Sequence, residues 1–205
     1  MSARYAIERG TWKEAARLQP RASRFPYTEA LTHFAGALGA AQSGDPRVAQ
    51  KHVQELAVLR DRLKAANNSY WATEVDVNRL GAAAWTALAD GKREEALGLM
   101  RQAADMEDKN EKHIVTPGRI VPARELLGEM LLELKRPAEA LKEFEHSQTR
   151  EPNRFRGLYG AARAAAQSGD VAKAKTYYEK LLRLSQNADI ERPEIGEAKA
   201  FFLKK

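Results

Sequence analysis

Residues 121–154 form two short helical patterns separated by a tight turn, and this stretch constrains the fold more than any other part of the chain. Apolar residues recur at helical spacing in both halves. Gly128 in the first half and Ala140 in the second are small enough for two helix backbones to approach closely, and Phe144 is placed to fill the space where the pair opens. The stretch therefore predicts a hairpin of two closely packed helices.

The same residues resemble the signature of the tetratricopeptide repeat (TPR) family. That signature has a Leu-Gly pair, a small residue, an aromatic residue, a second small residue and a proline at fixed offsets; here they are Leu127-Gly128, Ala140, Phe144, Ser147 and Pro152. The first large position, usually Trp, is Arg124, so the match is incomplete. The resemblance implies an all-α fold, a right-handed α-α solenoid of helical hairpins with a C-terminal capping helix, which binds polypeptides in its concave groove.

A second pattern runs along the whole chain. A turn residue, glycine in four cases and lysine in one, lies five positions before an alanine; the pairs are Gly10–Ala15, Gly44–Ala49, Gly91–Ala96, Lys135–Ala140 and Gly169–Ala174. Successive pairs are 34, 47, 44 and 34 residues apart. A fixed internal offset with variable gaps predicts repeated hairpins separated by insertions.

These patterns predict a single TPR-like solenoid over residues 1–205. In chain order its expected parts are a partial repeat and linker (1–26), hairpins at 27–66 and 70–110, an inserted loop (111–120), hairpins at 121–154 and 155–188, and a capping helix (190–205). On the capping helix we expect Glu194, Glu197 and Lys199 on a polar outer side, and Ile195, Ala198, Phe201 and Phe202 on an apolar side.

The first repeat is incomplete, because only about two helical turns precede Gly10. A solenoid that begins inside a hairpin leaves an apolar face uncovered. We therefore expect that Met1 is not the natural start and that the chain packs against missing N-terminal repeats. The phrases ARYAIERGTWKEAA and KHIVTPGRIVPARELLGE are similar to the C-terminal part of a family of long, mostly uncharacterised bacterial TPR proteins, and this resemblance implies no activity.

The repeat pattern does not explain residues 111–120, EKHIVTPGRI. Pro117-Gly118 suits a type II turn, and Ile114, Val115 and Ile120 are apolar. Two interpretations stay open. The loop packs across a repeat junction and sets its angle, or it folds over the groove and gates or occupies it.

Composition excludes several classes of site. The chain has no cysteine, so it has no disulfide, no thiolate zinc site and no cysteine nucleophile. No apolar run reaches the roughly 20 residues that span a bilayer, and we expect no membrane partner and a cytoplasmic protein. The net charge is +6, but most basic residues lie beside acidic ones on expected helix exteriors, so we expect no nucleic-acid partner.

No pattern of residues indicates catalysis. The four histidines, His33, His52, His113 and His146, form no local metal-binding pair, and phosphate-binding or nucleophile motifs are absent. The carboxylates of Glu125, Glu129 and Glu133 lie along one expected helix face without a second carboxylate opposite. We therefore predict a protein that is not an enzyme and uses no cofactor and no metal. An enzymatic role would require a histidine beside a carboxylate in an enclosed pocket.

The predicted ligand is a protein or peptide segment bound by the inner stripe of the first helices of each hairpin. From that stripe we predict nine groove residues: Phe34, Leu38, Asn78, Trp85, Glu125, Glu129, Arg156, Tyr159 and Arg163. Phe34, Trp85 and Tyr159 are the expected aromatic anchors. Arg156 and Arg163 are two turns apart on one helix face, and we expect them to pair with a peptide carboxylate. The competing interpretation places Phe34 and Trp85 in the core.

Two functions follow from this pattern. The first is a non-catalytic scaffold that binds a polypeptide segment in the groove. The alternative is a C-terminal regulatory or packing domain of a larger enzyme or receptor, whose groove is filled intramolecularly by the missing N-terminal part or by residues 111–120.

Overall fold

The computed structural model describes residues 3–111, 119–190 and 192–203. All regular secondary structure in these ranges is helical, which confirms the predicted all-α fold of helical hairpins. The helices are α1 (Ala3–Arg9), α2 (Trp12–Ala16), α3 (Pro26–Gln42), α4 (Pro46–Ala65), α5 (Ser69–Ala89), α6 (Arg93–Lys109), α7 (Ala123–Glu133), α8 (Pro137–Arg150), α9 (Phe155–Gln167), α10 (Val171–Leu184) and α11 (Pro193–Leu203). Most of the inserted loop, including His113 and Pro117-Gly118, lies outside the described residues, so both interpretations of it stay predictions.

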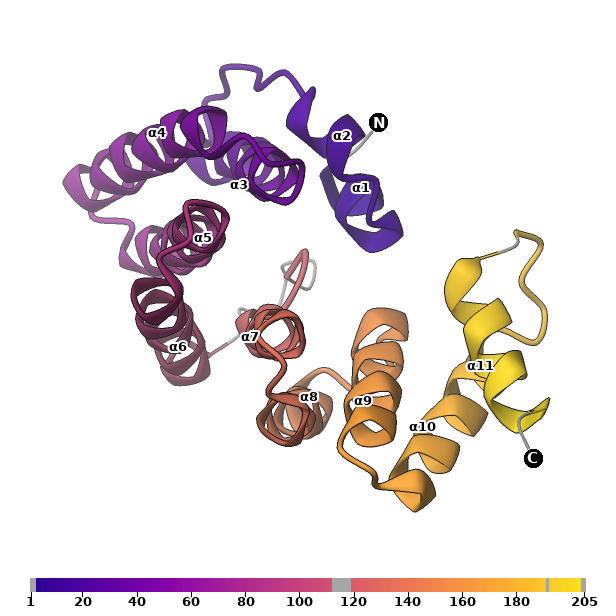
Figure 1. Cartoon of the computed structure of the whole chain (residues 1–205). Helices are drawn as coiled ribbons and strands as arrows, with labels where there is room; N and C mark the ends of the chain where they lie inside the picture. Colours follow the sequence, from indigo (N-terminus) through magenta and orange to yellow (C-terminus); the bar gives the residue numbers. More distant parts are fainter. Residues whose placement is uncertain (1–2, 112–118, 191, 204–205) are drawn as a thin grey trace. The chain divides into compact units, whose positions relative to one another are not determined.

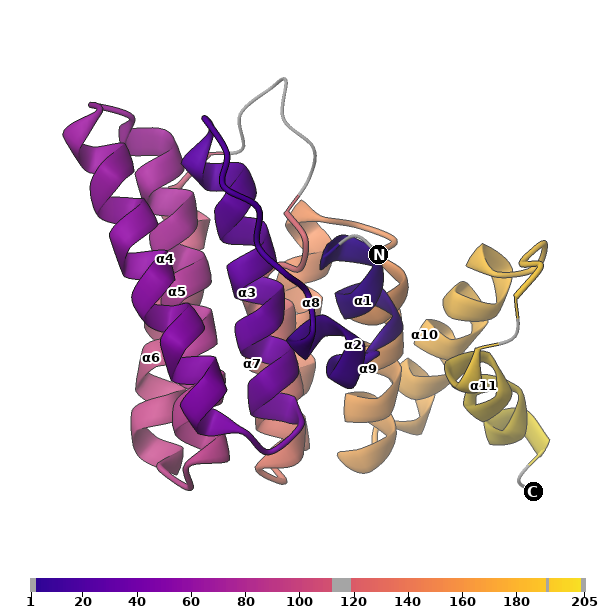
Figure 2. The ribbon, with the colours of Figure 1, turned by 90° about the horizontal axis from the view of Figure 1, so that it is seen from above.

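The chain forms two compact units, residues Met1–Ala123 and Arg124–Lys205, so one continuous solenoid over residues 1–205 stays a prediction. In the first unit, α3 pairs with α4 and α5 pairs with α6. Helix α5 also packs against α3 and α4, and α1 and α2 pack against α3, as the two views in Figures 1 and 2 show. In the described ranges, no helix is both long and apolar enough to cross a membrane.

In the second unit, consecutive helices pack from α8 to α11. The core beneath the last helix consists of Leu158, Ala162, Tyr178, Leu181 and Ala198. Helix α7 meets α8 where Gly128 faces the ring of Phe144, and α9 meets the same ring at Gly160. The small residues predicted from the sequence therefore allow close approach on both sides of Phe144.

The fixed offset between turn residue and alanine has a clear structural basis. All five turn residues have positive φ, between 60° at Lys135 and 84° at Gly169. In each turn the next residue donates its N–H to the carbonyl five residues earlier, as from Asp45 to Ala40, so every first helix ends in a Schellman-type cap. The five partner alanines, Ala15, Ala49, Ala96, Ala140 and Ala174, are completely buried.

A buried network in the first unit ties the chain just before α7 to α5 and α6. The Arg119 guanidinium donates to Glu74 Oε1 at 2.8 Å and lies 3.2 Å from Glu107 Oε1. Glu107 also accepts the Ala123 N–H at 2.8 Å, and Asn110 donates to Glu74 at 2.7 Å. Burial raises the pKa of Glu107 to about 7, although the charge of Arg119 opposes this shift.

Candidate polypeptide-binding face

The structure corrects the predicted exposure of four of the nine groove residues. Phe34, Leu38, Trp85 and Glu125 have between 0% and 2% of their surface exposed, so they offer almost nothing to a partner. For Phe34 and Trp85 this agrees with the competing interpretation as core residues. For the two residues on α3, Phe34 and Leu38, a physical reason is the close packing of α2 against this helix: a Cβ added at Gly39 would come within 2.6 Å of the Trp12 carbonyl oxygen.

Five predicted residues remain partly exposed: Asn78 on α5, Glu129 on α7, and Arg156, Tyr159 and Arg163 on α9. Asn78 belongs to the first unit and the other four to the second. We call Glu129, Arg156, Tyr159 and Arg163 the α9 face. Whether these residues contact a partner stays a prediction, but their local geometry distinguishes them.

Two arginines near the start of α9 are already paired with carboxylates. Arg154 donates to Glu125 at 3.0 Å, and Arg156 donates to Glu129. Burial raises the pKa of Glu125 to about 7, with Arg154 acting against it. Gly157 makes room for this pair, because a Cβ there would come within 2.6 Å of Glu125 Oε1. Arg156 is therefore committed to a partner within the unit, and the predicted pairing of Arg156 and Arg163 on one carboxylate is not favoured.

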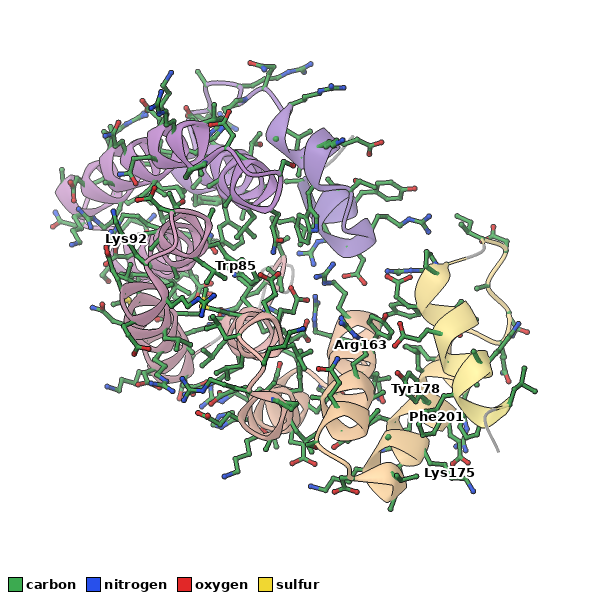
Figure 3. The ribbon with its side chains drawn as sticks, viewed as in Figure 1. Trp85, Lys92, Arg163, Lys175, Tyr178 and Phe201 are labelled. Atoms are coloured by element: carbon green, nitrogen blue, oxygen red, sulfur yellow. The ribbon has the colours of Figure 1, made fainter. Side chains whose placement is uncertain are left out.

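Arg163 differs from these two residues. In the described part of the chain its guanidinium forms no ion pair, and it lies over the ring of Tyr159 at 5.4 Å from the centroid. A cation over an aromatic ring is attracted to the ring but keeps its donors available. Figure 3 labels Arg163 on α9.

Tyr159 is in turn held by the last helix. Its hydroxyl donates to Glu197 Oε2 at 2.6 Å, and Tyr178 donates to Oε1 of the same carboxylate at 3.0 Å. Burial, and to a lesser extent the hydrogen bond to Glu197, raise the pKa of Tyr159. Phe201 packs on Tyr178 with ring centroids 4.9 Å apart, and both residues lie between α10 and α11 in Figure 3.

Sequence reasoning missed the role of Glu197. We expected it on the polar outer side of the capping helix, whereas it is bonded to α9 and α10. Phe202, expected on the apolar side, is 40% exposed. The only sequence signal was that Glu197 lies next to Ala198 and one turn before Phe201, which are the residues that α11 turns towards α10.

The histidines also contain a pair that the sequence did not reveal. His33 on α3 and His52 on α4 have their Nδ1 atoms 3.0 Å apart, so one ring donates and the other accepts. Gly36 leaves space for the His52 ring. Over residues 3–111, 119–190 and 192–203, no group of three or more His, Asp or Glu side chains is arranged to hold a metal ion.

Comparison with known proteins identifies the hairpin that carries this face. Residues 155–187 match the family model described as tetratricopeptide repeat. The chain contains a TPR. The matched TPR consists of α9 and α10, so the three α9 residues of the face lie on its first helix. A repeat of this family indicates a protein-interaction scaffold.

A solved structure from a functional characterisation of Pseudomonas aeruginosa PilF is similar to this TPR-containing chain, with a TM-score of 0.46 and 16% sequence identity. The similarity covers 98% of this chain and 86% of that one. No curated protein matches the sequence.

Proposed function

We propose that this protein is a non-catalytic scaffold that binds a polypeptide segment, and that a carboxylate of the segment pairs with Arg163 on α9. The observation that carries the proposal is the state of Arg163: it is partly exposed, oriented by Tyr159, and without an ion pair in the described chain. Neighbouring Arg154 and Arg156 already bind Glu125 and Glu129.

The neighbouring side chains hold the Arg163 guanidinium in one orientation. Glu197 holds the Tyr159 hydroxyl, and Tyr159 lies beneath the guanidinium. An arginine oriented in this way loses less side-chain entropy when it binds a planar carboxylate. Tyrosine and arginine are also the residue types that dominate binding hot spots.

The test begins with a displayed library of random peptides with free C-termini, selected on the full chain. Enriched peptides are resynthesised with a fluorescent label, and their dissociation constants are measured for the wild type, Arg163→Gln and Arg183→Gln. Arg183 is exposed on α10, so its substitution makes the same change of charge on a different helix.

We expect the selection to enrich acidic side chains or a particular C-terminal residue, and Arg163→Gln to weaken binding by about tenfold or more. Arg183→Gln should change affinity by less than about twofold. Equal affinity of Arg163→Gln and wild type for every enriched peptide would refute the role of Arg163.

A further inference from the structure

A second surface with a different composition lies in the first unit, on the segment between α2 and α3. Residues 17–25 contain Arg17, Arg21 and Arg24, all exposed, and no acidic residue occurs between Glu14 and Glu29. None of the three arginines forms an ion pair within the described ranges. The segment therefore presents an uncompensated positive charge.

A cavity of about 810 Å³ lies along this segment, bounded also by α1 and the first turns of α3. Its apolar lining includes Leu18, Ala22, Leu31 and Ile120, and Arg4 and Arg21 contribute positively charged groups. The Glu29 carboxylate, which also lines the cavity, accepts the Ser23 N–H at 3.3 Å. Its volume lies within the roughly 300–1,000 Å³ of typical ligand sites.

A row of aromatic rings continues from the same segment. The Arg24 guanidinium lies 4.7 Å from the centroid of Phe25, which packs on Tyr27 at 5.7 Å. Tyr27 stacks on Trp71 at 4.0 Å with the planes 9° apart, and Trp71 meets the edge of Tyr70 at 5.1 Å. The row joins the start of α3 to the start of α5, and Phe25 is 42% exposed.

We propose that residues 17–25, with the adjoining cavity and Phe25, form a second binding surface for an acidic, extended polypeptide segment that places an apolar side chain in the cavity. The three arginines match acidic side chains, and the lining of Leu18, Ala22, Leu31 and Ile120 matches an aliphatic or aromatic one. We call these residues the linker surface. This site is independent of the α9 face.

The aromatic row favours a polypeptide over single-stranded nucleic acid. Bases bind by stacking on open ring faces. Here Tyr27 and Trp71 stack on each other, and Arg24 covers a face of Phe25. The cavity suits an apolar side chain against Leu18, Ala22, Leu31 and Ile120, whereas the Glu29 carboxylate in its lining would repel the phosphate of a nucleotide.

The test uses the full chain and labelled probes of defined composition at physiological salt. One peptide alternates Glu and Asp with Leu and Pro, a second has Ser in place of Leu, and a single-stranded oligothymidine is the third probe. Fluorescence anisotropy gives each affinity for the wild type, for Arg21→Glu/Arg24→Glu, and for Arg47→Glu/Lys51→Glu. The last pair makes the same change of charge on exposed positions of α4.

We expect the leucine peptide to bind the wild type, and to bind the linker-surface variant about tenfold or more weakly, with less than about a twofold change in the α4 variant. The serine peptide should bind the wild type about tenfold more weakly than the leucine peptide, because it leaves the cavity unfilled. Equal losses in both variants would show that net charge alone attracts the probe. Equal binding of the serine peptide, or stronger binding of oligothymidine with the same dependence on Arg21 and Arg24, would also overturn the proposal.

Discussion

The ring of Phe144 lies so close to Gly160 that a Cβ added to Gly160 would come within 2.3 Å of ring atoms Cε1 and Cζ. Phe144 is completely buried, and Gly128 on α7 faces the same ring, so the ring has no space into which it can retreat. The packing of α7, α8 and α9 therefore depends on the absence of a side chain at Gly160.

We expect Gly160→Ala to destabilise the second unit by about 1–3 kcal/mol, because overpacking of a fixed ring outweighs the gain in helix propensity. Chemical denaturation measures the loss. Gly196→Ala is the control, since nothing lies within 4 Å of the added Cβ in α11. A Gly160→Ala variant as stable as the wild type would show that Phe144 is free to move.

Of the five turn residues with positive φ, Lys135 should contribute least to the stability of the fold. It has φ of 60°, where a Cβ is unfavourable, whereas the other four turns have glycine. We expect Lys135→Gly to raise the free energy of unfolding by about 1 kcal/mol, and Gly169→Ala to lower it by a similar amount. Thermal or urea denaturation of the two variants gives both values, and the same sign for both would contradict the account.

The turns could be predicted from sequence because their chemistry is local. The positive φ, the bond to the carbonyl five residues earlier and the buried alanine all lie within one short segment. Exposure could not be predicted in this way. Helical spacing shows that Phe34, Leu38 and Trp85 share a face with other inner residues, but neighbouring helices decide whether that face is open.

Contacts between residues far apart in the sequence could not be predicted either. His33 and His52 meet because α3 and α4 pair, and Arg119 reaches Glu74 across 45 residues of sequence. No local motif marks either contact. Glu197 illustrates the same difficulty, since an isolated carboxylate on an amphipathic helix is normally solvated.

Arg119→Ala should cost about 3–5 kcal/mol, because it leaves the carboxylates of Glu74 and Glu107 buried without their cation. The side chains of all three residues are between 7% and 13% exposed. The control is Lys92→Ala in the same unit, because the side chains of Lys92 and its partner Asp90 are 58% and 50% exposed, and its cost should be only a small fraction of the Arg119→Ala loss. Similar losses for the two variants in urea denaturation would show that the Arg119 network is not energetically special.

The His33–His52 pair predicts a loss of stability on acidification. Burial lowers the pKa of both rings, and Glu29 on α3 and Glu55 on α4 act in the opposite direction. The unfolded chain therefore binds protons more readily than the folded one. The contribution of the pair to the free energy of unfolding is fully present above the unfolded pKa of about 6.5. It is lost as the pH falls from that value through the lowered pKa of the folded state.

Two carboxyl groups change the free energy of unfolding in the opposite direction as the pH falls. The pH profile of wild-type stability alone therefore does not isolate the effect of the histidines. The pKa of Glu107 and Glu125 is about 7, and their contribution is lost as the pH rises from about 4.5 to about 7. We expect His33→Asn/His52→Asn to lose less stability than the wild type between about pH 7.5 and pH 5.5. An equal or larger loss in the double variant would contradict the assignment.

The central claim, that the protein binds a carboxylate of a polypeptide through Arg163, is tested most directly by a double-mutant cycle. Titration calorimetry compares the peptide selected on the chain with its carboxamide analogue, each against the wild type and Arg163→Gln. The account predicts that the carboxylate improves binding to the wild type by about tenfold and improves binding to Arg163→Gln hardly at all, a coupling of about 1.4 kcal/mol. The same preference for the carboxylate in both proteins would contradict it.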